Sequence, residues 1–334
     1  CPFGAIVDKG QIFQLIQSIK RGDEVIAIVA PAFINQFPGM TPSKLKEAMR
    51  QLGFADVAEV AIGADLCTID EAKDFMEEVP AKIPFMGTSC CPAWSVMAKK
   101  LFPQFKDNIS MALTPMVITA RMVKKDHPNA RIVFVGPCSA KKLEANRRSV
   151  RSDVDFVLTF EELRAILDAR GLELAEMPEI TAGEPSSYGR IFARTGGVAE
   201  SVRRVAKLEG IETEINPIRC SGIEECIKTM KLASFGRLEE NLIEGMACKG
   251  GCTNGAASIF HDQRGIQRVN DFSRLALTDN PMEGIRGYDM AGVNMEREFP
   301  ELEKMKEITA GEKKAKKQAT AKAKKEAIAK GEVE

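Results

Sequence analysis

Nine cysteines are the residues best suited to chemistry in this chain of 334 residues, and only two histidines, His127 and His261, accompany them. A zinc site that mixes cysteine with histidine, or an iron site with two histidines, would have to use nearly every histidine present. The sequence shows no secretory signal, so we expect metal ligands or redox groups rather than structural disulfides. Thiolate-only iron chemistry fits these residues best.

Four cysteine-bearing loops each follow a strand-like segment. They are Thr88–Trp94, Gly136–Lys142, Arg219–Gly222 and Met246–Cys252. In open α/β sheets, ligands bind beyond the carboxyl ends of the strands, so these loops can converge on one cleft. Pro92 and Pro137 stiffen two of the loops, and Gly250–Gly251 frees backbone amides to face sulfur or an anion. Lys141 can place a compact positive charge there.

The alternative for any one of these cysteines is a buried free thiol of the core. We favour that alternative for Cys67 and Cys226, and we expect that Cys220 is not a ligand either. The adjacent pair Cys90–Cys91 and the spaced pair Cys248/Cys252 favour a cluster instead.

The segments between the loops alternate between strand and helix. The expected strands are Val25–Val29, Asp56–Ile62, one ending near Gly87, Arg131–Val135, Asp155–Leu158, Thr213–Ile218 and Leu242–Ala247. Helices are expected from Thr41 to a stop at Gly53, from Gly63 onwards, and over Glu161–Arg170. This alternation predicts an α/β fold of two lobes, each a small twisted, mainly parallel sheet flanked by helices, with a cofactor in the cleft between them.

The predicted domain boundaries follow from this pattern. Residues 1–23 are interpreted as the remnant of a ferredoxin-like domain and a linker. The cysteine motif of a bacterial ferredoxin ends with a cysteine followed by proline, as in Cys1-Pro2, and this last cysteine binds the other cluster of a two-cluster pair. An arbitrary cysteine at that position is the alternative. The first lobe is expected at 24–145, the second at 146–303, and a solvated tail rich in lysine and alanine at 304–334.

Charge and hydropathy exclude two classes of protein. The 47 basic and 47 acidic side chains give a formal net charge of zero, which argues against a dedicated nucleic-acid binder. No apolar run approaches the roughly 20 residues that span a bilayer. We therefore expect a cytoplasmic protein without membrane insertion.

Three spaced motifs together resemble the catalytic domain of iron-only (FeFe) hydrogenases. They are TSCCPAW at Thr88–Trp94, GPCSAKKLE at Gly136–Glu144 and MACKGGC at Met246–Cys252. The resemblance extends over roughly residues 1–300. It implies a six-iron H cluster, in which a 4Fe–4S cubane is joined through one cysteine sulfur to a di-iron unit carrying CO, cyanide and an azadithiolate bridge. Further 4Fe–4S clusters are expected in an upstream segment, with Cys1 as a ligand.

The resemblance also implies a role for individual residues. The implied cubane ligands are Cys91, Cys138, Cys248 and Cys252, of which Cys252 would bridge to the di-iron unit. Cys90 would exchange a proton with the bridgehead amine, and Lys141 would hold a cyanide by a charge-assisted hydrogen bond. The residues that match the lining of the di-iron pocket are Ala30, Pro31, Pro115, Phe192 and Met246.

A proton route is implied in the same way, from the thiol through Glu71 and Ser110 to Asp74. Glu71 and Asp74 are three residues apart, so both fall on one face of a helix. The alternative for either carboxylate is a solvated surface group. Both carboxylates lie on a helix that directly follows a strand at the expected cleft, and this position favours the relay.

Two departures from the family pattern indicate a divergent clade. Gly136 stands where well-known members have a methionine, and Lys249 replaces a proline, with Thr253–Ser258 in place of a glycine-rich stretch. Residues around a cluster tune its potential and protonation.

The resemblance implies reversible conversion of two protons and two electrons into H2 in anaerobic hydrogen metabolism. A ferredoxin-type carrier would exchange the electrons and maturation proteins would supply the di-iron unit. One alternative is a hydrogen sensor of low turnover. Another is a hydrogenase-like iron–sulfur assembly protein, against which Pro31, Lys141 and Cys252 argue because they serve the di-iron half.

Overall fold

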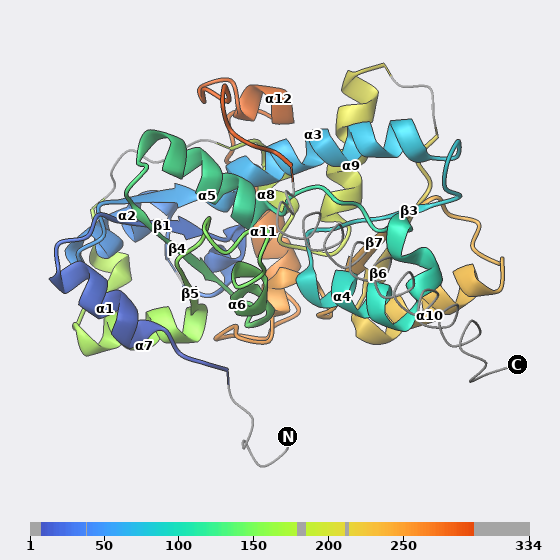
Figure 1. The fold of residues 1–334 in the computed structure, drawn as a ribbon. Helices are drawn as coiled ribbons and strands as arrows, with labels where there is room; N and C mark the ends of the chain where they lie inside the picture. The colour runs from blue at the N-terminus through green and yellow to red at the C-terminus, as the bar shows by residue number, and fades with distance from the viewer. Residues whose placement is uncertain (1–7, 38, 179–184, 211–213, 297–334) are drawn as a thin grey trace, which may run out of the picture. The chain divides into compact units, whose positions relative to one another are not determined.

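The computed structural model describes residues 8–37, 39–178, 185–210 and 214–296. The predicted roles of Cys1 and of the tail at 304–334 lie outside these residues. Within them, seven strands form two sheets, and every strand pairing is parallel. The predicted α/β fold with two small sheets flanked by helices is confirmed (Figure 1).

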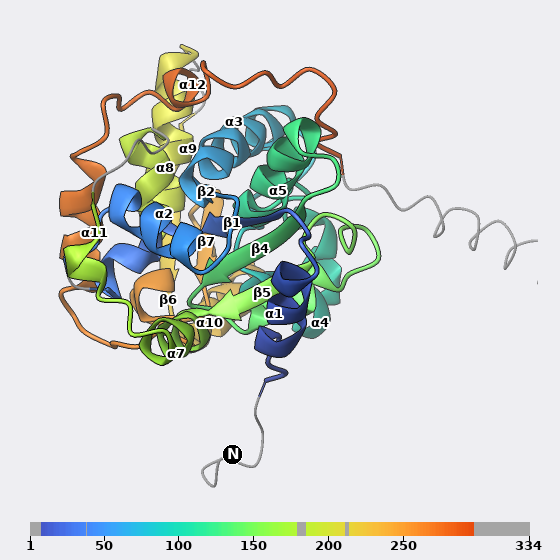
Figure 2. The ribbon, with the colours of Figure 1, turned by 90° about the vertical axis from the view of Figure 1, so that its left-hand side faces the viewer.

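The first sheet has the strand order β2-β1-β4-β5. Its strands are β1 (Val25–Val29), β2 (Asp56–Glu59), β4 (Arg131–Gly136) and β5 (Phe156–Thr159). All five residues of β1 are buried, as expected for a strand covered on both faces by helices. The helices around this sheet are α1 (Ile12–Lys20), α2 (Pro42–Gln51), α5 (Pro115–Asp126) and α7 (Phe160–Ala169), and Figure 2 shows α1 and α7 next to β5.

The second sheet has the strand order β3-β7-β6. Its strands are β3 (Met86–Gly87), β6 (Pro217–Ser221) and β7 (Leu242–Met246), and helices α4 (Pro92–Leu101), α9 (Gly197–Leu208) and α10 (Ile223–Ser234) pack against it. Trp94 is fully buried over Gly245, where a Cβ atom would lie 2.0 Å from the indole ring. This contact holds the first cysteine motif against β7, the central strand of the sheet, which leads into the third cysteine motif.

Helix α3 (Val60–Glu78) connects the two sheets. It packs against α5 and α8 (Ser187–Ile191) on one part of its length and against α9 on another, and Figure 1 shows it running past all three. Gly63 permits the contact with α5, because a Cβ there would lie 2.5 Å from the carbonyl oxygen of Pro115. The helix is therefore buried around most of its first half, as helices in the interior of a protein are.

Two strand predictions need correction. The strand expected over Asp56–Ile62 ends at Glu59, and the helix begins at Val60 rather than at Gly63. A short run of buried apolar residues has the same sequence pattern in a strand and in a buried helix, so periodicity alone could not separate them. Of the strand expected over Thr213–Ile218, Thr213 lies outside the described residues, and the observed strand is Pro217–Ser221.

The two sheets alternate along the chain. Strand β3 lies in the predicted first lobe, yet it pairs with β7 of the second sheet. Strand β5 lies in the predicted second lobe, yet it pairs with β4 of the first sheet. Helix α1 also belongs to the core of the first sheet through Leu15, although residues 1–23 were expected to be a remnant and linker. The predicted boundary between residues 145 and 146 therefore does not separate the strands of the two sheets.

The remaining helical segments are short. They are η1 (Pro31–Asn35), η2 (Pro103–Asn108), α6 (Ala140–Ala145), η3 (Leu174–Glu176), η4 (Cys252–Asn254), α11 (Gly265–Ser273) and α12 (Pro281–Gly284). Among the described residues, no helix combines the length and apolar character needed to cross a membrane.

Candidate functional site

An apolar cavity of about 70 Å³ lies at the carboxyl ends of both sheets. Strands β1 and β4 are neighbours in the first sheet. The chain after β1 leads to β2 on one side of this pair, and the chain after β4 leads to β5 on the other side, so their ends form a topological switch point. The backbone N–H of Ala30, after β1, donates to the carbonyl oxygen of Val135 in β4 at 2.9 Å. The cavity is lined by Ala30, Pro31, Val60, Ala64, Cys90, Cys91, Pro115, Met116, Phe134, Pro137, Cys138, Lys141, Phe192, Ala193, Met246 and Cys252.

All five residues predicted to line a di-iron pocket lie on this cavity, together with apolar neighbours that the sequence did not single out. Phe134 is one of them, and it explains why position 136 is glycine. A Cβ atom at Gly136 would lie 2.5 Å from the ring of Phe134. The aromatic ring thus fills the space next to Gly136 on the cavity wall.

Of the four thiols predicted as cubane ligands, Cys91, Cys138 and Cys252 line this cavity, and Cys248 lies near Cys91 and Cys252. Cys91 follows β3, Cys138 follows β4, and Cys248 and Cys252 follow β7. Burial raises the pKa of Cys252, and the neighbouring thiols of Cys91, Cys138 and Cys248 raise it further. Burial, with Cys91 as the next cause, also raises the pKa of Cys138 to about 11. Without a metal, the thiols of Cys138 and Cys252 stay protonated, because an uncompensated buried thiolate is costly.

This donor set fits an iron–sulfur cluster better than a single ion. Among the described residues, no group of three or more His, Cys, Asp or Glu side chains is arranged to hold one metal ion. Each thiolate of a cubane binds a different iron, so the four sulfurs stand farther apart than the ligands of one zinc ion. Four soft donors around an apolar space therefore suit a cluster whose iron charge would compensate the thiolates.

Two of these cysteines lie at the beginning of helices. Cys91 is the residue immediately before α4, and the sulfur of Cys138 accepts backbone hydrogen bonds from Ala140 and Lys141 at the start of α6. These two hydrogen bonds favour the thiolate of Cys138 and oppose the effect of burial on its pKa. Gly250 and Gly251, both with φ of +84°, shape the loop that carries the other two cysteines.

Among the described residues that line the cavity, Lys141 alone has a charged side chain. Its Nζ donates to Oε2 of Glu144 at 2.7 Å and to the carbonyl oxygen of Cys90 at 3.2 Å. Glu144 also accepts from Oγ1 of Thr114 at 2.8 Å. Burial alone would lower the pKa of Lys141, but the Glu144 carboxylate outweighs it and the pKa is raised. The ammonium is therefore charged and fixed in place.

Cys90 lies beside a buried carboxyl group. Burial is the largest cause that raises the pKa of Cys90 well above its ordinary value, and Glu71 is the next. Oε1 of Glu71 accepts from the backbone N–H of Ser89 at 2.8 Å and from its Oγ at 3.1 Å. Oε2 of Glu71 is buried and has no hydrogen-bond partner among the described residues. Burial raises the pKa of Glu71 to about 7, although both bonds from Ser89 oppose that shift.

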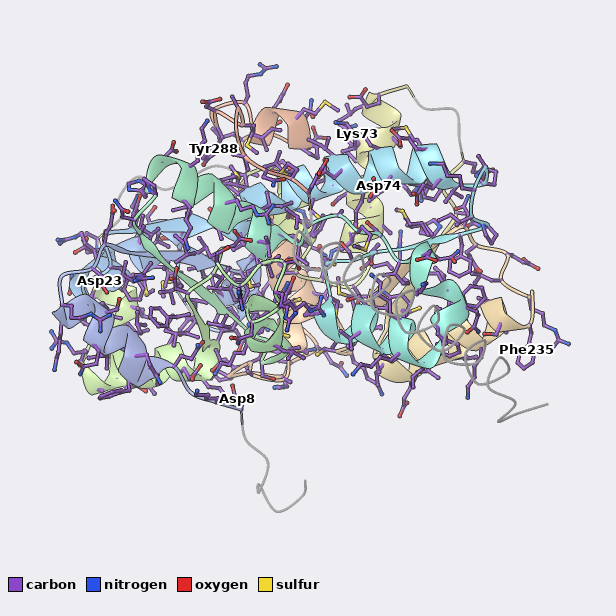
Figure 3. All side chains as sticks on the ribbon, in the orientation of Figure 1. Asp8, Asp23, Lys73, Asp74, Phe235 and Tyr288 are labelled. Atoms are coloured by element: carbon purple, nitrogen blue, oxygen red, sulfur yellow. The ribbon has the colours of Figure 1, made fainter. Side chains whose placement is uncertain are left out.

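Ser110 and Asp74 form a second pair farther along the predicted route. Oγ of Ser110 donates to Oδ2 of Asp74 at 3.4 Å and accepts from the backbone N–H of Ala112 at 3.1 Å. Asp74 is half-buried on α3, where Figure 3 labels it. Among the described residues, both hydrogen bonds to Glu71 come from Ser89, so no direct hydrogen bond joins Glu71 to the pair of Ser110 and Asp74.

Sequence reasoning missed Ser89, Glu144 and Phe134. Ser89 stands next to Cys90 inside the first motif, and Glu144 stands three residues after Lys141 inside the second, so both carried a local signal. Phe134 carried no such signal, because it lies inside strand β4, two residues before the second motif begins. The prediction that Cys67 and Cys226 are buried in the core is confirmed.

Known proteins resemble this chain in sequence and fold. Iron hydrogenase 1 from Clostridium pasteurianum is 30% identical over 321 residues, which cover 80% of this chain and 56% of that protein. Cytosolic iron-sulfur assembly component 3 from Mus musculus is 26% identical, covering 71% of this chain and 61% of that protein. The chain therefore spans little more than half the length of these curated relatives. A solved structure of a variant of [FeFe]-hydrogenase HydA1 from Chlamydomonas reinhardtii has the same fold, with a TM-score of 0.68 and 21% identity over 85% of this chain and 96% of that one.

The family described as "Iron only hydrogenase large subunit, C-terminal domain" matches residues 23–256, which include all three cysteine motifs and every described residue that lines the cavity. This chain belongs to that family of iron-only hydrogenase large subunits.

Proposed function

We propose that this chain is the hydrogen-converting domain of an FeFe hydrogenase, which interconverts two protons and two electrons with H2. The observation that supports the proposal is one cavity whose wall holds three of the proposed cluster thiols together with Cys90. Cys91, Cys138 and Cys252 line it together with Lys141, and Cys90 links its wall to the buried carboxyl of Glu71.

The residues present fit an H cluster. Cys91, Cys138, Cys248 and Cys252 would hold the cubane, with Cys252 shared with the di-iron unit. Lys141 and the apolar residues Ala30, Pro31, Pro115, Phe192 and Met246 would surround that unit. When bound, the cofactor supplies the redox centre and the Lewis-acidic iron for forming or splitting H2.

The side chains of the protein would then manage the protons. Cys90 has a thiol on the cavity wall, where it can give or take a proton. Ser89 orients Glu71, whose pKa of about 7 allows it to change protonation near neutral pH. Ser110 and half-buried Asp74 would extend the route towards solvent. The apolar lining limits water near the cofactor.

The proposal also requires a source of electrons and of the cofactor. A ferredoxin-type carrier would exchange electrons through iron–sulfur clusters, with Cys1 as a proposed ligand of an upstream cluster, and maturation proteins would supply the di-iron unit. Anaerobic hydrogen metabolism is the matching setting.

A second candidate is an iron–sulfur assembly factor that holds a cubane without a di-iron unit. The 26% identity to cytosolic iron-sulfur assembly component 3 from Mus musculus supports it. The position of Cys90 and Lys141 on a cavity that the cubane thiols do not fill favours the hydrogenase.

Infrared spectroscopy after co-expression with maturation proteins tests the proposal, combined with an H2 assay. Metal-bound CO and cyanide absorb where proteins do not. Bands accompanied by steady turnover are expected. Bands with negligible turnover would point to a hydrogen sensor, and absence of bands in a protein that holds a cubane would point to the assembly factor.

A further inference from the structure

The loop that carries Cys252 is held by two side chains from a distant part of the chain. Asn35 and Gln36 lie at the end of η1, which begins at Pro31 on the cavity wall. Nδ2 of Asn35 donates to the carbonyl oxygen of Thr253 at 3.1 Å, and Nε2 of Gln36 donates to the same oxygen at 3.3 Å. Both amide side chains are buried, and Thr253 directly follows Cys252. We call these two hydrogen bonds to one carbonyl oxygen the amide clamp.

Each amide of the clamp is oriented by a partner that can only donate. Nη1 of Arg268 donates to Oδ1 of Asn35 at 2.7 Å, so the NH2 group of Asn35 faces the other way. The backbone N–H of Phe260 donates to Oε1 of Gln36 at 2.8 Å, and Nε2 of Gln36 also donates to the carbonyl oxygen of Phe260 at 3.0 Å. The donors of both side chains are therefore directed at the carbonyl oxygen of Thr253.

The clamp belongs to a closed ring of polar contacts. Nη1 of Arg268 lies 3.0 Å from Oδ2 of Asp262, and the backbone N–H of Asp262 donates to Oδ1 of Asn254 at 3.1 Å. Asn254 is the chain neighbour of Thr253, the residue that Asn35 holds, so the ring returns to its starting point. A rotation of any one amide would break contacts on both of its sides.

The same loop is attached to the cavity wall on its other side. The backbone N–H of Thr253 donates to the carbonyl oxygen of Ala193 at 3.0 Å, and Ala193 lines the cavity. A Cβ atom at Gly255 would lie 2.4 Å from the carbonyl oxygen of Pro137, which also lines it. Both backbone groups of Thr253 are thus bonded, and this leaves the preceding residue, Cys252, little freedom to move.

We propose that Asn35 and Gln36 are positioning residues for the cluster: the amide clamp holds Cys252 in place and directs two N–H donors at the peptide group of Thr253 next to it. Donor dipoles near an iron–sulfur cluster stabilise its reduced, more negative state and so raise its reduction potential. This inference rests on the proposed function in requiring a cubane, but the hold on Cys252 exists without one.

Two substitutions remove the donor of Asn35 in different ways. Asn35→Leu replaces the amide by an apolar group of similar size, whereas Asn35→Asp keeps an acceptor for Arg268 but turns a carboxylate oxygen towards Thr253. Asn108→Leu is the matched control, since Asn108 is also buried and donates to the carbonyl oxygen of Phe85 at 2.9 Å, in the core of the second sheet.

Alkylation by iodoacetamide, followed by mass spectrometry, measures the hold on Cys252 in the full chain without a cluster. Both Asn35 variants should label Cys252 about tenfold faster, the usual effect of leaving a buried hydrogen-bonding group without its partner. Cys138 and Cys226, on other elements, are internal references and should label at the parental rate. Gln36→Met removes the other donor and repeats the test if an Asn35 variant does not fold.

The second readout is the reduction potential of the cubane after reconstitution with iron and sulfide alone. At a fixed potential, Asn35→Leu should lower the ratio of reduced to oxidised cubane about tenfold, which corresponds to about 59 mV for a one-electron couple. Asn35→Asp should lower it further, because the carboxylate adds a negative charge. Asn108→Leu should keep the parental potential although it also loses a buried hydrogen bond.

These two readouts separate the inference from the proposed function. Unchanged labelling of Cys252 in the folded variants, or potentials that do not fall in this order, would overturn the inference. A chain that takes up no cubane would refute the proposed function, and the labelling of Cys252 would still decide whether the clamp holds this residue.

Discussion

Cys90 differs from its neighbour Cys91 in what surrounds its sulfur. Cys91 precedes a helix and lies near the thiols of Cys138, Cys248 and Cys252. Cys90 lies beside Glu71, and its carbonyl oxygen accepts a hydrogen bond from Lys141. A serine in place of Cys90 keeps the size of the side chain but is a far weaker acid. We expect Cys90→Ser to retain all its iron and the CO and cyanide bands while it loses most H2 turnover, and Cys90→Asp to retain more.

The measurement combines iron content, infrared spectra and the rate of H2 evolution. Cys226→Ser is the matched control, because this thiol is buried in the core of the second sheet and donates to the carbonyl oxygen of Met246 at 3.6 Å, a bond that a hydroxyl can also make. It should keep both iron and turnover. If Cys90→Ser worked at the parental rate, the proposed roles of Glu71, Ser110 and Asp74 would fall with that of Cys90.

Glu71 should make the stability of the protein depend on pH. Burial raises its pKa from 4.5 to about 7, so the folded state binds this proton more tightly than the unfolded state. The resulting stabilisation is complete below about pH 4.5 and is lost as the pH rises through about 7. Between pH 5 and 8, the free energy of unfolding should fall by about 1–3 kcal/mol more in the parent than in Glu71→Gln.

Urea denaturation at both pH values checks this difference. Comparison with Glu71→Gln is essential, because burial also raises the pKa of Asp65 and of Glu244 to about 7, and these groups add to the same slope. Parallel pH profiles for parent and variant would show that Glu71 is ionised throughout.

At the scale of residues, the sequence predicted the groups that stand inside short motifs. Cys90, Cys138 and Lys141 could be predicted because each belongs to a short sequence motif whose neighbouring residues are also characteristic. Phe134 and Glu244 could not, because each lies inside a strand and outside the three motifs. Their sequence pattern is only that of a buried strand.

The contact between Trp94 and Gly245 holds two elements together. Nε1 of Trp94 donates to the carbonyl oxygen of Thr88 at 3.0 Å, so the ring joins α4, the loop after β3 and strand β7. A methyl group at position 245 would overlap the ring. We expect Gly245→Ala to lower the free energy of unfolding by about 1–3 kcal/mol, as overpacking of a core does.

Urea unfolding followed by fluorescence suits this test, because Trp94 is the single tryptophan of the chain. Gly287→Ala is the matched control, since a Cβ there meets nothing within 4 Å. It should leave the midpoint nearly unchanged. Equal stability of both variants would mean that the ring moves aside without cost.

At the scale of elements, hydrophobic runs with clear ends were predictable. Strand β1 has its predicted bounds. Helix α2 starts after Thr41, whose Oγ1 accepts from the N–H of Lys44 at 3.2 Å. Gly53, which has a positive φ, follows the end of this helix. The start of α3 was not predictable, because its first turns are buried all round and lack the polar face that gives a helix its period.

For the whole molecule, the boundary between lobes could not be derived from the order of elements. Pairing of distant strands is decided by tertiary packing, and β3 contributes only Met86 and Gly87 to its sheet. A strand of two residues has no usable hydrophobic pattern. The chain passes from β1 and β2 of the first sheet to β3 of the second, returns to β4 and β5 of the first, and ends with β6 and β7 of the second.

This alternation predicts how the chain behaves when it is divided at the expected boundary. The fragment 8–145 would lack β5 and α7, and with them the buried side chains of Leu158, Phe160 and Leu163 from the core of the first sheet. Each such side chain contributes about 1.5–3 kcal/mol, against a total stability of about 5–15 kcal/mol for a typical protein. The fragment 146–296 would lack β3 and α3. Neither fragment should unfold cooperatively by itself.

Co-expressed, the two fragments should associate, because β5 of one can pair with β4 of the other. Copurification through a tag on one fragment and a single urea transition of the complex are the expected results. Val157→Asp should abolish association, because Val157 is buried and lies opposite Phe134 in the register of β4 and β5. Arg151→Asp, at an exposed position of the same fragment, should not. Two fragments that each unfold cooperatively and elute separately would show that the lobes are independent domains after all, and that the pairing of β5 with β4 contributes little to either.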